Sequence, residues 1–428
     1  MRGIAGLSLA ALVLVPAAAL AAGPIQRVSL SSTGKQGFRD SYAPALSDNG
    51  RFVAFSSGAA KLVPGDDNHK VDVFVRDLRT GKTTLVSLGQ GGVEGNGTSD
   101  FPALSAGGRF VAFDSEAGNL VPGDTNGAED VFVRDRLAGT TERVSVATDG
   151  TQGNGYSFLG NVSSDGRYVT FESGASNLVP GDTNDGFDVF VRDRLNGTTE
   201  RVSLGPGGIQ ADGSSFAPQI SGDGRMVVFQ SGARNLAPGD TQGLRNIYRR
   251  DLRTGRIERV SDGPGGAVGD SECFAPSVSR DGRFTAFTSY SANLVPGDTN
   301  DLPDVFVHDS ATGTTERVNV GPGGRQADGF GFAFFRAISG DGRYVTFYSL
   351  ASNLVAGDTN EEIDVYLHDR QTGRTELLSG GLSGHGGDRL SEDATISANG
   401  HIVAFASRAS NLVPRDTNIV EDIFVTPR

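Results

Sequence analysis

The chain has 428 residues, a formal net charge of −13 and one cysteine, Cys273. An acidic balance of this size repels the phosphates of nucleic acids and of anionic lipids, so neither a nucleic acid nor a membrane surface is an expected partner. A single cysteine also excludes an internal disulfide.

The first 22 residues have the features of a signal peptide. Arg2 precedes an uncharged apolar run from Ile4 to Val15, and the small residues around Ala19-Leu20-Ala21 offer a cleavage site. The alternative is an uncleaved membrane anchor, because the apolar stretch approaches spanning length. We expect cleavage of residues 1–22, export to the periplasm or the medium, and no membrane insertion afterwards. Residues 23–428 are then expected to form a single domain.

Seven copies of one block of about 58 residues fill this domain. Each copy is marked by an Arg before alternating apolar residues, and the seventh copy has His401 in its place. The marker occurs at Arg51, Arg109, Arg167, Arg225, Arg283 and Arg343. A fixed period of this size is typical of stacked or ringed units, each too small to bury its own apolar face.

The third repeat predicts four strands. A short first stretch ending at Val162-Ser163 leads into Asp165-Gly166, a pair typical of a two-residue type I′ hairpin. Tyr168–Ser173 alternates in β-formers, and Asp188–Asp193 is nearly continuous in them, as in a strand covered on both faces. Asn196-Gly197 is a second tight turn before the strand Thr198–Leu204. Each repeat is therefore expected to be a four-stranded antiparallel meander in an all-β chain.

Seven such units indicate a β-propeller, with a linear solenoid as the rival architecture. The chain ends favour the ring. The seventh repeat stops at Pro427-Arg428 without its fourth strand, and Gln26–Leu30 matches the fourth strand of repeat three, Glu200–Leu204. We therefore expect the fold class to be a seven-bladed propeller in which Ile25–Leu30 pairs with Asp422–Val425 and closes the last blade.

The hairpin geometry also predicts an ion pair in each of six blades. The marker Arg begins the second strand, and an Asp ends the third strand, so the two side chains should lie side by side. The expected pairs are Arg51/Asp77, Arg109/Asp135, Arg167/Asp193, Arg225/Asp251, Arg283/Asp309 and Arg343/Asp369. Blade seven lacks both members, with His401 and Pro427 instead. Loss of both together favours a structural role.

The repeat resembles the PD40, or WD40-like, repeat of TolB-type propellers. The resemblance rests on Ser-x-Asp-Gly-Arg before an alternating strand and on a later Asp-x-Phe-x-x-Asp, repeated over residues 24–428. It implies an exported, monomeric binding or scaffold protein for a protein or envelope component. TolB has an additional α/β domain for which the repeats leave no room, so a Tol–Pal role is not expected. Oligogalacturonate lyases resemble this family too and hold a metal largely through histidine, but the five histidines here suggest no such cluster.

The connections between strands predict a working face. Both tight turns of a blade lie at one end of its strands and both long connections at the other, and long loops more often carry function. The most repeated acidic pattern in the long loops is Asp-x-Asn-x-x-x-Asp. It occurs at Asp66/Asn68/Asp72, Asp124/Asn126/Asp130, Asp182/Asn184/Asp188, Asp298/Asn300/Asp304, Asp358/Asn360/Asp364 and Asp416/Asn418/Asp422. These oxygens could hold Ca²⁺, but we expect them to close Asx-turns, with no metal and no cofactor.

Enzyme signatures are thin. The chain has neither a G-x-S-x-G elbow nor an H-E-x-x-H pair. We therefore expect no catalytic residues and a non-catalytic binding or scaffold role through the long-loop face. The alternatives are a secreted hydrolase or lyase acting on polysaccharide or peptide, and a calcium-stabilised adhesion module.

One loop departs from the repeat. The segment entering blade six is two residues longer and contains Phe330, Phe332, Phe334, Phe335 and Arg336. Four Phe and an Arg on the long-loop face could form an apolar patch that binds a partner. Alternatively they plug the mouth of the central channel.

Overall fold

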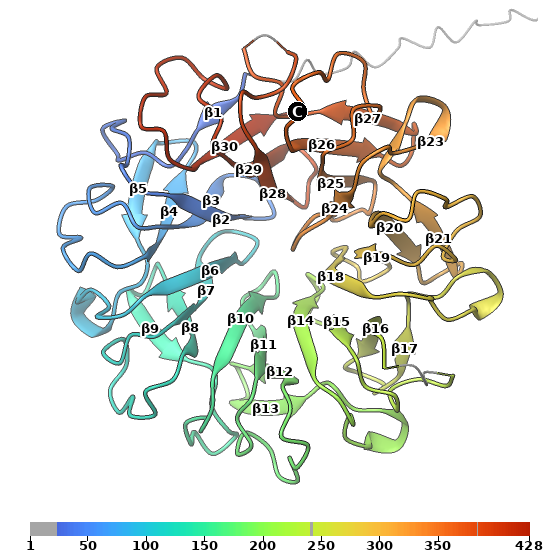
Figure 1. The fold of residues 1–428 in the computed structure, drawn as a ribbon. Helices are drawn as coiled ribbons and strands as arrows, with labels where there is room; N and C mark the ends of the chain where they lie inside the picture. Colours follow the sequence, from blue (N-terminus) through green and yellow to red (C-terminus); the bar gives the residue numbers. More distant parts are fainter. Residues whose placement is uncertain (1–23, 240–242, 383) are drawn as a thin grey trace, which may run out of the picture.

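The computed structural model describes residues 24–239, 243–382 and 384–428, and they form a ring of seven four-stranded antiparallel sheets (Figure 1). We number these blades 1 to 7 along the chain. Blades 1 to 4 are β2–β5 (Ser41–Leu46, Phe52–Ser57, Asp72–Asp77, Lys82–Leu85), β6–β9 (Ser99–Leu104, Phe110–Ser115, Asp130–Asp135, Thr140–Arg143), β10–β13 (Ser157–Val162, Tyr168–Ser173, Asp188–Asp193, Thr198–Arg201) and β14–β17 (Ser215–Ile220, Met226–Ser231, Asn246–Asp251, Ile257–Arg259). Strands Tyr168–Ser173 and Asp188–Asp193 have the predicted bounds.

Blades 5 to 7 complete the ring. They are β18–β21 (Cys273–Val278, Phe284–Ser289, Asp304–Asp309, Thr314–Arg317), β24–β27 (Gly331–Phe332, Tyr344–Ser349, Asp364–Asp369, Arg374–Leu377) and β28–β30 with β1 (Ser391–Ile396, Ile402–Ser407, Asp422–Pro427, Gln26–Arg27). A small hairpin, β22–β23 (Val320–Gly321, Arg325–Gln326), and four single 3₁₀ turns (Gln90–Gly92, Pro206–Gly208, Pro264–Gly266, Pro322–Gly324) lie in the connections. Cys273 is the first residue of β18 and is buried.

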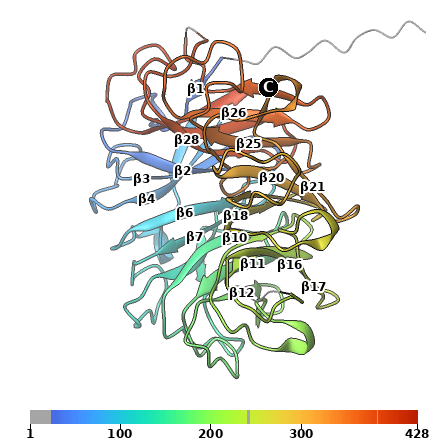
Figure 2. The ribbon, with the colours of Figure 1, turned by 45° about the vertical axis from the view of Figure 1, so that its right-hand side comes forward.

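The apolar core lies between neighbouring blades, which stack face to face around the ring (Figure 2). Val131, Val133 and Val144 of blade 2 pack in one cluster with Val169 and Phe171 of blade 3. Within each blade an aromatic pair on the second and third strands is stacked, as in Phe171 and Phe190 with ring centroids 5.6 Å apart. A single blade therefore cannot bury its apolar faces, which is why the repeat must recur.

The N-terminal strand closes the ring as predicted. β1 pairs antiparallel with β30, with Gln26 opposite Val425 and Arg27 opposite Phe424, and the amide of Val28 donates to the carbonyl of Ile423 at 2.8 Å. In Figure 1 the blue β1 lies beside the red β30. The guanidinium of Arg27 reaches Asp416 at 2.7 Å and Asp422 at 3.1 Å, and all three side chains are buried. Residues from the two ends of the chain thus share one sheet.

The first turn of each blade differs from the prediction. In blade 3 the residue pair Ser163 and Tyr168 is hydrogen-bonded, so four residues connect the strands, and the left-handed residue is Gly166 with φ +78°. A Cβ on Gly166 would lie 2.0 Å from Cδ2 of Phe110 in the preceding blade. Glycine is therefore required twice, for its backbone angle and for contact between blades. Asp165 accepts from Ser163 and from the amide of Arg167.

Backbone hydrogen bonds join the turns of neighbouring blades at the tight-turn end of the central channel. Ser164 donates its amide to Gly222, Arg280 to Gly340 and Gly340 to Ala398, each on the following blade. All six predicted Arg–Asp pairs form beside these turns, with N–O distances of 2.6 or 2.7 Å. Because these ion pairs are nearly identical in six blades, they are structural elements of the tight-turn face. The blades differ from one another mainly at the opposite, long-loop end.

Candidate functional site

Three positions at the long-loop end of every blade surround the channel mouth, and we call them the rim. They are the second residue of the first strand, its neighbour at the end of the second strand, and the residue before the third strand. From blade 1 to blade 7 the first is Tyr42, Asp100, Phe158, Phe216, Phe274, Phe332 and Glu392. The second is Ser56, Asp114, Glu172, Gln230, Thr288, Tyr348 and Ala406, and the third is Val71, Glu129, Phe187, Arg245, Pro303, Ile363 and Glu421.

The rim has an acidic arc over blades 7, 1 and 2. Burial, with the charges of Glu116 and Asp100, raises the pKa of Glu129 to about 7. On blade 7 burial raises the pKa of Glu421 to about 7 and that of Asp393, next to Glu392, to about 6. These carboxyl groups are costly to ionise in place, and a cation brought near them would relieve that cost.

Blade 1 lies in the middle of the acidic arc, and blade 3 extends the arc beyond blade 2. On blade 1 the Tyr42 hydroxyl donates to Asp100 at 2.6 Å, and burial together with this bond raises the pKa of Tyr42. On blade 3 Glu172 is buried, accepts from the amide of Ala217 at 2.6 Å, and has a pKa raised to about 7 by burial. Arg408 is the nearby cation, with its guanidinium 3.1 Å from Glu421 and 3.4 Å from Asp40.

An aromatic arc covers the rim of blades 3 to 6. Tyr156, Phe158, Phe187 and Phe216 form a continuous row with successive ring centroids 5.9, 6.0 and 5.6 Å apart. The Arg245 guanidinium lies 4.4 Å from the ring centroid of Phe274, an arrangement that uses the ring face to bind a cation. Tyr156 and Tyr290 are about half exposed. The arc is therefore an accessible platform for apolar and cationic groups.

The longer loop of blade six divides between this platform and the channel. Phe332 stacks on Tyr348 with centroids 5.8 Å apart, and Phe330 lies 5.5 Å from Phe332. Phe334 and Phe335 instead contact each other and line a pocket at the channel mouth together with Phe101, Pro102 and Asp393. The residues predicted as one patch thus divide between the aromatic arc and the pocket at the channel mouth. That they bind a partner stays a prediction.

Arg336 holds the loop across the channel. Its φ is +58°, and its Nη1 donates to the carbonyl of Pro102 on blade 2 at 3.0 Å. Burial lowers its pKa to about 10, with Asp48 acting in the opposite direction. Because the guanidinium already bonds to the channel wall, the geometry favours a packing role for Arg336. Phe334 and Phe335 still line the pocket at the channel mouth.

The repeated acidic loops are mainly structural. Their Asn side chains close the expected Asx-turns, as when Asn126 Oδ1 accepts from the amide of Ala128 at 3.0 Å. In blade 3 the guanidinium of Arg201 lies 3.1 Å from both Asp182 and Asp188. Blade 4 departs from the pattern, and its Asp240 and Gln242 lie outside the described residues.

Sequence reasoning missed most of the rim. It singled out the segment from Phe330 to Arg336 as the departure from the repeat. The acidic residues Glu129 and Glu421 were not singled out. Aligning the residue before each third strand would have found them, because that position holds six residue types in seven blades whereas the next residue is Asp in six of them.

No protein-family model matches the chain, and no curated protein is detectably similar to it in sequence. Solved structures are similar in fold. An oligogalacturonate lyase in complex with manganese is 12% identical, with a TM-score of 0.52, over 95% of this chain and 94% of its own. The β-propeller domain of the Trilobed protease from Pyrococcus furiosus, which has an open Velcro topology, is 11% identical, with a TM-score of 0.55, over 91% and 95%. A TolB from Agrobacterium tumefaciens, described as putative, is 18% identical, with a TM-score of 0.41, over 65% and 80%.

These comparisons correct the expectation that the protein is not an enzyme. The same propeller fold, over nearly the full length of both chains, is that of a lyase, and a protease contains it as a domain. A likeness at this identity shows the fold alone. The missing G-x-S-x-G and H-E-x-x-H motifs therefore give no ground for excluding catalysis on this scaffold.

Proposed function

We propose that the protein binds a basic protein segment across its rim. Cationic side chains of the partner would lie on the acidic arc, and its apolar or aromatic side chains on the aromatic arc and in the channel-mouth pocket. The observation that carries this proposal is the division of the rim into an acidic arc and an aromatic arc on a scaffold whose core positions largely repeat. Positions that only support the ring have no reason to differ in this way.

The electrostatics support a cationic partner. The formal net charge of −13 steers cations towards the protein at low ionic strength. Within the rim, a lysine or arginine placed beside Glu129 or Glu421 would lower a pKa now near 7, so binding at neutral pH should release protons. The aromatic arc adds apolar area and ring faces, which favour a segment carrying Leu, Phe, Tyr or Arg.

Export is the second part of the proposal. We infer action in the periplasm or outside the cell from residues 1–22, which lie outside the described residues, and from the resemblance of the repeats to TolB-type propellers. Among the residues that the structure describes, no helix has the length and apolar character needed to cross a membrane.

A peptide array tests the proposed binding. We expect enrichment of basic peptides with an apolar or aromatic residue over acidic peptides of matched length. Binding should weaken in Glu129→Gln/Glu421→Gln and in Tyr156→Ala/Phe187→Ala, while Phe335→Ala tests the channel-mouth pocket. The matched control is Leu137→Ser/Leu195→Ser, which removes two exposed apolar side chains from the tight-turn face. An array with no preference for basic peptides would overturn the proposal.

A second candidate is catalysis on a polysaccharide or peptide at the same rim. Glu129 and Glu172 on neighbouring blades both have pKa values of about 7, near the value that suits acid–base catalysis. Turnover of a polyuronate or peptide library, lost in both Glu129→Gln and Glu172→Gln while binding persists, would support it. Binding without turnover in the unmodified protein would remove it.

A further inference from the structure

In four blades one buried arginine lies between the paired Asp residues of the long loops and offsets one of their two negative charges. Arg201 lies 3.1 Å from both Asp182 and Asp188, and Gln210 donates to Asp182 at 2.8 Å. The equivalent triads are Asp124/Asp130/Arg143 in blade 2, Asp298/Asp304/Arg317 in blade 5 and Asp416/Asp422/Arg27 in blade 7. Each triad carries one net negative charge.

Blade 1 keeps the two Asp residues and loses the arginine. Leu85 stands where the sister blades have Arg143 and Arg201, in the same register opposite the third-strand Phe. Glu94 replaces the glutamine of the sister blades at the same bridge position. Asp66, Asp72 and Glu94 therefore bring three negative charges together, and in the described part of the chain no Lys or Arg forms an ion pair with them.

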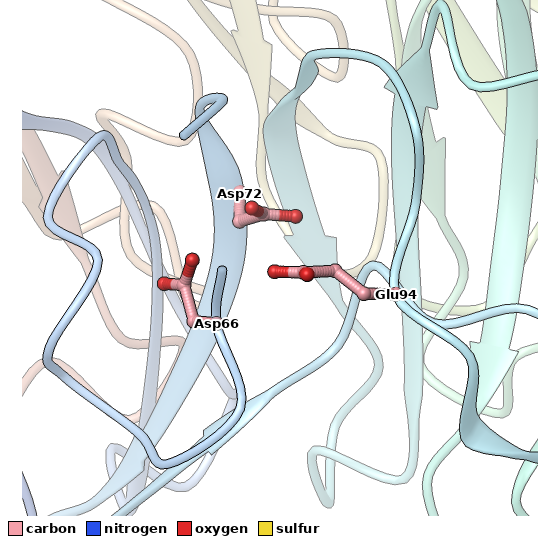
Figure 3. Close-up of side chains that lie close together, drawn as sticks. All are labelled: Asp66, Asp72 and Glu94. Carbon is pink, nitrogen blue, oxygen red and sulfur yellow. The ribbon is translucent and has the colours of Figure 1, made fainter. Parts of the chain in front are cut away.

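Two oxygens of this cluster are buried and unpartnered. Asp66 is only 4% exposed and its Oδ1 has no hydrogen-bond partner, and neither has Oε1 of Glu94. Figure 3 shows the Glu94 carboxylate pointing between Asp66 and Asp72. Burial, with the charges of Asp72 and Glu94, raises the pKa of Asp66 to about 7. Unsatisfied buried acceptors aimed at one another require a cation or a proton.

The rest of the cluster is held in place by the fold. Asp72 accepts from Ser87 Oγ at 2.5 Å and from Asn68 Nδ2 at 2.9 Å, and Glu94 accepts from the amide of Asp67 at 3.2 Å. Asp66 Oδ1 and Glu94 Oε1 thus stay free for another ligand, and each oxygen of Asp72 accepts one hydrogen bond and keeps a lone pair for a further ligand. These hydrogen bonds fix the carboxylates in place and leave acceptor positions on them available to a cation.

Blade 6 shows what loss of the arginine alone produces. Leu377 occupies the arginine position there, but Tyr366 donates its hydroxyl to Asp358, and a glycine, Gly386, adjoins Asn360 and Asp364 where blade 1 has Glu94. No third carboxylate is added. The combination of a lost cation and a gained anion is found, among the described blades, in blade 1.

We propose that Asp66, Asp72 and Glu94 bind one Ca²⁺, which takes the place of the arginine of the sister blades. A divalent ion brings the three carboxylates to the same single net negative charge as each Asp–Asp–Arg triad. Their ligand oxygens all lie within 4.8 Å of one another, and two oxygens at about 2.4 Å from one Ca²⁺ can be that far apart. Carboxylate oxygens are the ligands that hard cations prefer.

The test is calorimetric titration of the EDTA-treated full-length exported protein with CaCl₂, together with its melting temperature with and without Ca²⁺. We expect one Ca²⁺ per chain and a rise in the melting temperature. Leu85→Arg/Glu94→Gln copies the arrangement of blades 2 and 3 and so should fold. It should bind Ca²⁺ at least about tenfold more weakly and melt, in EDTA, no lower than the unmodified protein.

Two further variants separate a site from general acidity. Asp66→Asn should lose the response to Ca²⁺, whereas Asp182→Asn, the same change beside Arg201, should keep it. Arg201→Leu/Gln210→Glu should give blade 3 a second Ca²⁺ site. The proposal is overturned if the unmodified protein shows no heat and no shift with Ca²⁺, if Leu85→Arg/Glu94→Gln responds as before, or if Mg²⁺ binds and Ca²⁺ does not.

Discussion

Deleting residues 24–31 should open the ring. The deletion removes Arg27 from between Asp416 and Asp422, whose side chains are 5% and 1% exposed, and it removes Val28, which is 2% exposed. Taking one partner from a buried ion pair costs about 3–5 kcal/mol, and losing a buried valine costs about 1.5–3 kcal/mol. The two together amount to roughly 6 kcal/mol, a large part of the about 5–15 kcal/mol that stabilises a typical domain.

Scanning calorimetry measures the consequence. Unfolding entropy is about 2.1 cal/mol/K per residue, so for a propeller of this length one kcal/mol corresponds to about 1.2 °C. We expect the deletion to lower the melting temperature by about 7 °C or more. Gln26→Ala is the control, because Gln26 is exposed and pairs through its backbone. A deletion protein with an unchanged melting temperature would refute closure by this strand.

Three other predictions follow from contacts and charges. Gly166→Ala should lower the free energy of unfolding, measured in urea, by about 2–4 kcal/mol, because left-handed backbone strain adds to overpacking on Phe110. The control Gly150→Ala, at a residue with φ +87° and open space around it, should lower it by only about 1 kcal/mol. Equal losses of stability in the two variants would contradict the contact between blades. Arg27→Ala should lower the melting temperature much more than Arg325→Ala, because Arg325 is exposed and lies outside the triads. Similar melting temperatures for the two variants would show that Asp416 and Asp422 need no cation. The melting temperature should be highest near about pH 4–5. Arginine partners hold the pKa values of Asp77, Asp135 and Asp309 at about 2, below the ordinary value, so the stability that these carboxylates contribute disappears as the pH falls from about 4 to 2. Burial raises the pKa values of Glu129, Glu172 and Glu421 to about 7, so ionising these groups costs stability as the pH rises from about 4 to 7. A maximum at pH 8 would be inconsistent with those raised values.

The fold could be predicted because the sequence repeats its own pattern. Tyr168–Ser173 and Asp188–Asp193 were predicted with the bounds they have, and the match of Gln26–Leu30 to Glu200–Leu204 predicted how the ring closes. The turn at Asp165-Gly166 was predicted with the wrong type. Its four-residue form is closed by the hydrogen bond from the amide of Ser163 to the carbonyl of Tyr168 and by the hydrogen bonds that Asp165 accepts.

The candidate sites were harder to predict because they arise from differences between blades. Phe158 lies in β10 and Phe187 in the loop before β12, and the row that they form with Tyr156 depends on how that loop packs. Leu85 and Glu94 were visible in the sequence, but a lost arginine and a gained glutamate lie nine residues apart and become one site only when the structure places both beside Asp66. Comparing the seven repeats position by position is the signal that could have found both sites.

Photocrosslinking tests the proposed binding to the rim most directly. A basic peptide selected on the array, carrying one photoreactive residue, would be crosslinked to the full-length exported protein and the adducts mapped by mass spectrometry. Our account predicts adducts on blades 2 and 3, at the rim residues Glu129 and Phe187 and at the neighbouring Tyr156, and their loss in Glu129→Gln/Glu421→Gln. Adducts concentrated on the tight-turn hairpins, around Leu137 and Leu195, would contradict it.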